Sequence, residues 1–153
     1  MRKRTQGREF TLQILYQYEI NPQEFKPLLR SFWQEHSEAS EEIRHFTEAL
    51  VEGTLAHREE LDQVIGQYAE NWELHRMASV DRNILRFATF ELLFREDIPP
   101  KVTINEAVDI AKKYSNEDSG KFVNGVLDKI NHSEKARKTD PHSAPAPDNL
   151  GEG

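Results

Sequence analysis

Apolar residues recur at helical spacing in three successive segments between residues 81 and 130. Positions three and four apart lie on one face of a helix, and an apolar face packs against a core. The first of these helices is predicted to end before Pro99, because proline removes a backbone donor and excludes the helical conformation from the residue before it. The three predicted buried faces are Ile84, Leu85, Ala88, Leu92 and Leu93; Ile104, Ala107, Val108 and Ala111; and Phe122, Val123, Val126, Leu127 and Ile130.

Polar residues at the segment boundaries predict where these helices begin. Ser79 is a candidate N-cap, and Asp81 suits the positive end of the helix dipole. Thr103 and Glu106 have the spacing of a capping box, in which each side chain accepts a hydrogen bond from the other residue's backbone amide. Residues 115–118 predict the joint before the third helix.

The Asn124-Gly125 pair is a hairpin-turn signal that conflicts with the helical period around it. We give the period more weight and predict a continuous helix. Gly125 would then allow a close approach of another helix, at a cost of about 1 kcal/mol in helix propensity.

The first eighty residues predict further helices. Apolar residues cover much of a helix circumference over residues 8–19, which indicates a central helix that ends at Asn21-Pro22. Pro27 fits the first turn of a second helix, and Ser40 fits the N-cap of a third. Whether the third helix continues past Gly53 stays open. The predicted packing residues are Leu28, Leu29, Phe32, Trp33, Ile43, Phe46, Leu50, Leu61, Val64, Ile65 and Tyr68, with Trp72, Leu74 and Met77 in a connector.

Strand alternation is not sustained anywhere in the sequence, so we predict an all-α domain of six or seven helices. A chain of 153 residues with 37% hydrophobic residues can bury one domain-sized core. We place this domain at residues 1–132. Residues 133–153 are charged at first and then rich in proline and alanine, so we predict a disordered tail.

Several classes of chemistry are excluded. The sequence has no cysteine, which rules out disulfides and thiolate catalysis, and it lacks P-loop, GxGxxG, GxSxG and HExxH motifs. No apolar run approaches the roughly 20 residues of a membrane span, and we recognise no signal peptide. We therefore expect a cytoplasmic protein that is not an enzyme and uses no cofactor or metal.

Charge is distributed unevenly along the chain. The net charge of −7 divides into four positive charges in the first eight residues and −11 over the remainder. Arg2, Lys3, Arg4 and Arg8 form a candidate phosphate-binding cluster, since such side chains neutralise phosphates and release counterions. From charge alone, a solvated N-terminus is an equally good interpretation.

The segments DRNILRFATFEL, KVTINEAVDIAKKY and FVNGVLDKI, in this order and spacing, closely resemble the C-terminal half of the bacterial transcription antitermination factor NusB family. The segment GREFTLQILYQYEI extends the resemblance, which covers about residues 2–130. It implies two packed helical subdomains. It also implies binding to the boxA RNA element of nascent ribosomal RNA with NusE, a small basic ribosomal protein, in an antitermination complex with RNA polymerase and other Nus factors.

The resemblance also implies site residues. Tyr16 and Phe122 would stack unpaired bases, although residues at such spacing are more often part of a core. Asp118 and Lys121, with Phe122, would lie beside the basic N-terminus and contribute to the RNA surface, with Asp118 contributing specificity rather than affinity. The candidate residues for NusE binding are Arg76, Asp81 and Glu91.

One departure from the family pattern bears on this RNA site. Many relatives carry a longer arginine run before the first helix, whereas Gln6 and Gly7 interrupt the basic residues here. This predicts weaker intrinsic RNA binding and greater dependence on the partner.

Alternatives stay open. NusB-like domains also occur fused to RNA cytosine methyltransferases, so an accessory role in RNA modification is one, and a helical adaptor that binds only proteins is another. A homodimer closed through Phe90 and Phe94 is also open, unless these residues belong to the core.

Overall fold

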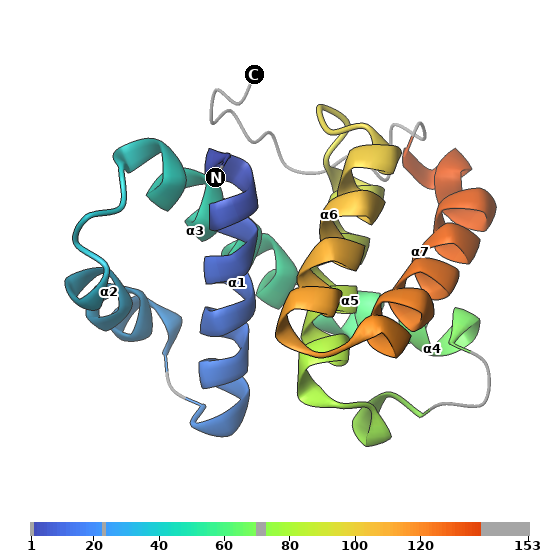
Figure 1. The fold of residues 1–153 in the computed structure, drawn as a ribbon, viewed down its shortest axis with the longest axis horizontal. Helices are drawn as coiled ribbons and strands as arrows, with labels where there is room; N and C mark the ends of the chain where they lie inside the picture. The colour runs from blue at the N-terminus through green and yellow to red at the C-terminus, as the bar shows by residue number, and fades with distance from the viewer. Residues whose placement is uncertain (1, 23, 70–72, 139–153) are drawn as a thin grey trace.

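The computed structural model describes residues 2–22, 24–69 and 73–138. This part of the chain holds seven α-helices, one short 3-10 helix and no strand, which confirms the predicted all-α class. Two groups of helices lie side by side (Figure 1). One group is α1 (Lys3–Ile20), α2 (Phe25–Glu35) and α3 (Glu41–Ala56). The other is α4 (Arg58–Tyr68), η1 (Leu74–Arg76), α5 (Ser79–Phe94), α6 (Pro100–Tyr114) and α7 (Glu117–Lys138).

Helix α5 joins the two groups, because it contacts α1 and α3 on one side and α4, α6 and α7 on the other. Its residues from Asn83 to Phe94 are buried, except for a half-buried Arg86. One continuous cluster of buried hydrophobic residues runs through both groups. Phe90 and Phe94 belong to this core, with 7% and 6% exposure, so they are not the exposed residues that a dimer surface requires.

Helix α1 packs closely on α3 at Gly7. A Cβ atom at this position would lie 2.6 Å from the Phe46 ring and 3.3 Å from the Thr47 hydroxyl. The Thr47 hydroxyl also donates to the Gly7 carbonyl at 3.4 Å. The glycine that interrupts the basic run is therefore required by helix packing.

The helix signals in the N-terminal half are confirmed. Ser40 caps α3 by accepting a hydrogen bond from the Ile43 amide at 3.2 Å, and Pro27 lies in the first turn of α2. The helical conformation is interrupted at His57, so α3 and α4 are separate helices. In the connector, Met77 is buried, whereas Trp72 lies outside the described residues.

Two predicted helix starts are wrong. Ser79 is the first residue of α5 and not its N-cap, since its hydroxyl donates to a carboxylate oxygen of Glu19 at 2.6 Å. The capping box of Thr103 and Glu106 does not form, because α6 already begins at Pro100, with φ preset by the proline ring. Both side chains lie inside α6 and face other helices.

Helix α7 runs unbroken through Asn124 and Gly125, as the helical period predicted. A Cβ atom at Gly125 would meet nothing within 4 Å, so the predicted close approach of another helix at this glycine is wrong. The helix continues to Lys138, past the domain boundary that we placed at residue 132, and residues 139–153 lie outside the described part. None of the described helices is long and apolar enough to cross a membrane.

Candidate nucleic-acid interface

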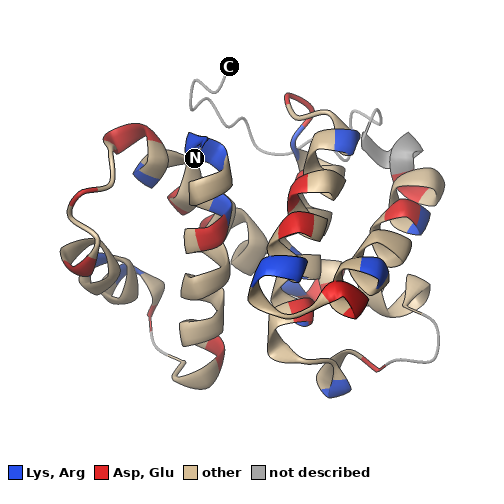
Figure 2. Ribbon diagram, in the orientation of Figure 1, with Lys and Arg blue, Asp and Glu red and all other residues tan. Residues whose placement is uncertain are grey.

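Three accessible cations lie at the start of α1, beside the N-terminus (Figure 2): Arg2 at the N-cap, and Lys3 and Arg4 in the first turn. The side chains of Arg2, Lys3 and Arg4 are 84%, 57% and 36% exposed. Exposed ion pairs are worth at most about 1 kcal/mol, so a phosphate can replace the acids that pair with Lys3 and Arg4 at low cost. The acid that pairs with Arg2, Glu106, is nearly buried and keeps its hydrogen bonds from Thr5 and Arg8 when Arg2 turns to a phosphate. The pairs are Arg2 with Glu106 at 3.2 Å, Lys3 with Glu42 at 2.9 Å and Arg4 with Asp97 at 3.7 Å.

Arg8 is not part of this accessible cluster. Its side chain is 2% exposed, and its guanidinium donates to both carboxylate oxygens of Glu91, at 2.7 and 2.9 Å. Burial disfavours the charged form of Arg8, but attraction to Glu91 and Glu106 outweighs burial and raises its pKa. The assignment of Arg8 to RNA contact is therefore corrected: it is an interior residue that connects α1 to α5.

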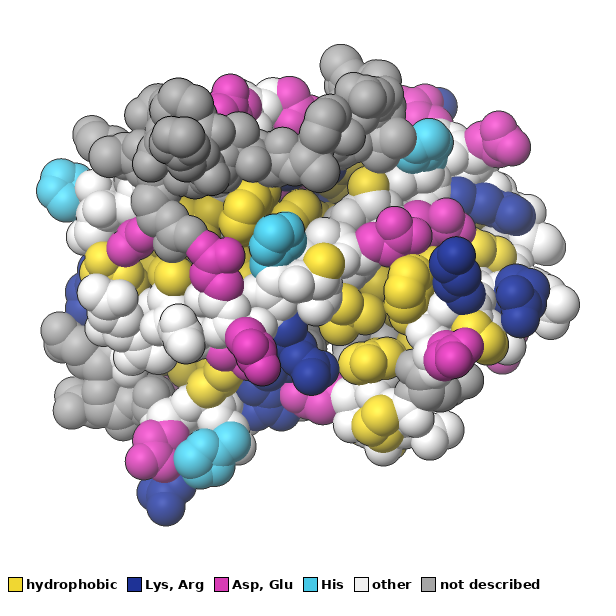
Figure 3. Space-filling model, turned by 180° about the vertical axis from the view of Figure 1, so that it is seen from behind, with side chains coloured by type: hydrophobic (Ala, Val, Ile, Leu, Met, Phe, Trp, Pro, Cys, Tyr) yellow, Lys and Arg dark blue, Asp and Glu magenta, His cyan; other side chains and the backbone are white. Residues whose placement is uncertain are grey.

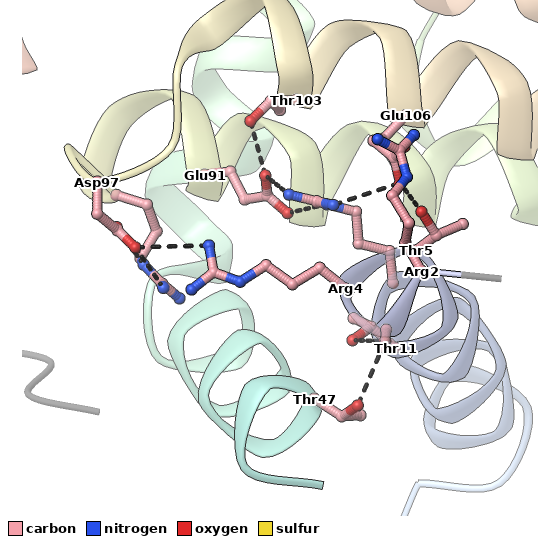
Figure 4. Close-up of polar contacts among 12 residues, drawn as sticks. Arg2, Arg4, Thr5, Thr11, Thr47, Glu91, Asp97, Thr103 and Glu106 are labelled. Atoms are coloured by element: carbon pink, nitrogen blue, oxygen red, sulfur yellow. Dashed lines mark hydrogen bonds and ion pairs between the residues drawn. The ribbon is translucent and has the colours of Figure 1, made fainter. Parts of the chain in front are cut away.

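Glu91 is equally inaccessible. It is 0% exposed and accepts a third hydrogen bond from the Thr103 hydroxyl at 2.6 Å (Figure 4). A side chain with no solvent exposure cannot contact NusE at the surface. The assignment of Glu91 to partner binding is corrected for the same physical reason as that of Arg8.

Glu106 positions the first turn of α1 against α6. Its side chain is 9% exposed, and one carboxylate oxygen accepts from the Thr5 hydroxyl at 2.7 Å and from Arg8 at 3.3 Å. The other oxygen accepts from Arg2 at 3.2 Å (Figure 4). This acid, which we had interpreted as half of a capping box, therefore sets where the exposed end of Arg2 lies.

The predicted base-stacking residues lie around the joint between α6 and α7. Tyr16 is 42% exposed near the C-terminal end of α1, and Phe122 is half-buried in α7. Asp118 and Lys121 are exposed in the first turns of α7. Gln13, one turn before Tyr16, donates to the Tyr114 hydroxyl at 3.3 Å, which places Tyr16 near the end of α6.

A shallow pocket of about 330 Å³ opens between the starts of α5 and α7. Its lining includes Met77, Asp81, Asp118, Ser119 and Phe122. One carboxylate oxygen of Asp81 is buried and has no hydrogen-bond partner among the described residues. Burial raises the pKa of Asp81 and outweighs the hydrogen bond from Ser119, which lowers it. The structure thus brings a predicted partner-binding residue into one pocket with two predicted RNA-binding residues.

An ion-pair network fixes the end of α1 beside this pocket. Arg82 donates to both carboxylate oxygens of Glu19 at 2.8 Å, and Ser79 donates to one of them at 2.6 Å. The hydrogen bonds from Arg82 are the largest cause that lowers the pKa of Glu19 to about 2. Arg76 lies apart on η1, exposed, and pairs with Glu73 at 3.5 Å.

The sequence reasoning missed a set of polar contacts across α1 and α6, which we call the α1–α6 polar interface. Lys113 donates to both carboxylate oxygens of Glu9, at 3.1 and 3.0 Å. The Tyr114 hydroxyl donates to Glu9 at 3.0 Å and accepts from Gln13. Apart from the buried contact of Arg8 with Glu106, this interface comprises Arg2 at the N-cap of α1, Thr5, Glu9 and Gln13 on α1, and Glu106, Lys113 and Tyr114 on α6.

A signal for this interface was present in the sequence. Arg2, Thr5, Glu9 and Gln13 recur three and four positions apart, so they share one face of α1 and continue to Tyr16. A polar face on a helix that is otherwise largely apolar indicates a neighbour with polar groups of its own. The identity of that neighbour required the fold.

The back of the molecule, opposite to the view of Figure 1, has a mixed surface over its described part. Over its described part, acidic, basic and histidine side chains are interspersed with apolar ones (Figure 3). Among the described residues, no three His, Cys, Asp or Glu side chains are grouped so that they could hold a metal ion.

Comparisons with known proteins agree with this geometry. The sequence model of the NusB family matches residues 5–132. The transcription antitermination protein NusB of Syntrophus aciditrophicus is 43% identical over 148 residues, which are 97% of this chain and 91% of the relative. The similar solved structures include the following two. A NusB of T. maritima has a TM-score of 0.79 and 36% identity, over 87% of this chain and 92% of the other. A crystal structure of antitermination factors NusB and NusE in complex with double-stranded RNA has a TM-score of 0.79 and 30% identity, over 87% of this chain and 98% of the other.

Proposed function

The chain belongs to the NusB family, and from that premise we propose that it is a non-catalytic antitermination factor that binds boxA RNA together with NusE. It acts in the cytoplasm on nascent ribosomal RNA and helps to assemble an antitermination complex with RNA polymerase and other Nus factors. The observation that carries the proposal is the similarity, at 30% identity and over almost the whole of the other chain, to a NusB that was crystallised with NusE and RNA.

The accessible residues suggest how RNA is bound. Arg2, Lys3 and Arg4 exchange their acidic partners for phosphates, and each neutralised phosphate of a single strand contributes about 0.7 to the slope of log affinity against log salt. Three such contacts give a slope of about −2. Because Arg8 lies in the interior, three cations remain for phosphate contact at the start of α1. This small number supports the expectation of weak intrinsic RNA affinity and dependence on NusE.

The aromatic residues near the end of α1 and the start of α7 supply the base contacts. Tyr16 and Phe122 offer ring faces, and base stacking on aromatic side chains is worth about 1–3 kcal/mol per base. Lys121 directly precedes Phe122 in the chain, so its ammonium group can pair with a phosphate next to the base that stacks on Phe122. Asp118 repels phosphate but accepts hydrogen bonds from base donors, so its contribution is to specificity.

Arg76 and Asp81 are the remaining candidates for contact with NusE. Arg76 is exposed, and Asp81, in the lining of an open pocket, has a buried oxygen with no hydrogen-bond partner in the described part of the chain. A donor from a basic partner would satisfy that oxygen. RNA and NusE would then bind adjacent surfaces and strengthen each other's binding.

Fluorescence anisotropy tests this proposal. A short boxA-type RNA and a scrambled RNA of equal length are titrated with the protein, with and without NusE, over a series of salt concentrations. We expect a preference for boxA, tighter binding with NusE, and a smaller salt slope in the Arg2→Gln, Lys3→Gln double variant than in Lys26→Gln, which removes an exposed charge from α2. Binding of NusE with no effect on either RNA would favour the helical adaptor instead.

A further inference from the structure

We propose that RNA crosses the α1–α6 polar interface and that Tyr114 stacks on one of its bases while Lys113 contacts a phosphate. This inference rests on the proposed RNA-binding function and adds two residues to it. Neither residue was among the candidates that the sequence or the family resemblance supplied.

The positions of the two ends of the site define the path. The basic cluster lies at the start of α1, and Tyr16 lies near its other end, roughly 21 Å away at 1.5 Å per residue. Side-chain hydrogen bonds link α1 to α6 along this length, from Arg2 with Glu106 at one end to Gln13 with Tyr114 at the other. An RNA strand that contacts both ends therefore passes the α1–α6 polar interface, where Lys113 and Tyr114 occupy the half nearer to Tyr16.

Tyr114 has the properties of a stacking residue. The residue is 37% exposed, and Tyr114 and Tyr16 are the two exposed aromatic residues in the described part of the chain. Its hydroxyl is fixed by Glu9 at 3.0 Å and Gln13 at 3.3 Å. The ring is therefore already held in one place, so binding a base costs little additional side-chain entropy.

The charges in this region favour phosphate despite the presence of an acid. Glu9 is 8% exposed, and its carboxylate is covered by the ammonium of Lys113 and the hydroxyl of Tyr114. Lys113 remains 52% exposed. An ammonium group has three N–H donors, of which Glu9 takes two, so one donor is available to a phosphate without loss of the internal pair.

Three variants test the stacking role, with boxA-type RNA and anisotropy as the readout. Tyr114→Ala removes the ring and should weaken binding about five-fold or more, with an unchanged salt slope. Tyr114→Phe removes the same two hydrogen bonds but keeps the ring, so it should stay within about two-fold of the parent protein. Val102→Ala, which truncates another exposed apolar side chain of α6, should have no effect.

The outcomes separate the alternatives. Equal losses in Tyr114→Ala and Tyr114→Phe would show that only the hydrogen bonds matter and would overturn stacking, as would a Tyr114→Ala variant that binds like the parent. If the parent protein itself does not prefer boxA over scrambled RNA, the proposed function fails first. Thermal unfolding of each variant confirms that the compared proteins are folded at the assay temperature.

Adjacent lysines test the phosphate contact. Lys113→Gln should lower the salt slope by about 0.7, the share of one phosphate on a single strand. Lys112 is the matched control, because its side chain lies against α7 at Gly120 instead of facing Glu9. Identical slopes for Lys113→Gln and Lys112→Gln would overturn the assignment of Lys113.

Discussion

Replacing Glu91 by glutamine removes one charge from a fully buried pair without changing the size of the side chain. Among the described residues, Arg8, 2% exposed, would then keep Glu106 at 3.3 Å as its one charged partner. Breaking a buried ion pair costs about 3–5 kcal/mol, because the remaining charge stays desolvated. Since Glu106 still compensates part of the charge, we expect the lower end, about 3 kcal/mol.

Urea denaturation followed by circular dichroism measures this loss as a lower free energy of unfolding. A loss of about 3 kcal/mol corresponds to a decrease in Tm of about 6–12 °C for a chain of this size. Glu96→Gln, at an exposed position just after α5, is the matched control and should stay within about 0.5 kcal/mol of the parent protein. The double variant Arg8→Met, Glu91→Leu should regain most of the stability, since a hydrophobic pair needs no compensating charge.

NusE binding supplies an independent readout of the same variant. Because Glu91 is 0% exposed, folded Glu91→Gln protein should bind NusE as the parent does. A loss of stability below about 1 kcal/mol would refute the buried-pair argument. Unchanged stability with weakened NusE binding would restore Glu91 as a surface contact.

Two further predictions concern charges at the surface and at the edge of the core. Glu42→Gln frees Lys3 from its ion pair and should raise RNA affinity by up to about five-fold, the equivalent of at most 1 kcal/mol. Glu41→Gln, which removes the adjacent exposed charge in the same turn of α3, should change affinity less in the same anisotropy assay. Glu19 has its pKa lowered to about 2, so its stabilisation is present above its ordinary value of 4.5 and is lost as the pH falls from 4.5 towards 2. The unfolding free energies of the parent and Glu19→Gln should therefore converge by about 1–2 kcal/mol over that range, after allowance for solvent screening, and a constant difference would contradict the role of Glu19.

Local patterns in the sequence determined the helices of this protein. Most of the apolar residues at three- and four-residue spacing are buried as predicted, with Val108 and Phe122 half-buried. Ser40 caps α3, and the helical period through Asn124-Gly125 outweighed a turn signal. These features depend on residues within one or two helical turns of each other, so the spacing of residues in the sequence is enough to predict them. The same local information gave the family, through motifs such as INEAV and FVNGVLD.

Only the tertiary structure decided where the charged side chains lie. Arg8 and Glu91 are 83 residues apart in the chain and form a buried pair, and Arg2 meets Glu106 from a distance of 104 residues. Arg2 and Arg8 are the same type of residue, and the residue pattern around α1 does not indicate which of them faces α5 and which faces solvent. The free energy of a charge depends on its burial and its partners, and both are set by how distant helices pack. For the same reason the capping-box interpretation of Glu106 was wrong and the contacts of Tyr114 with α1 were missed, although the helix that carries both residues was predicted.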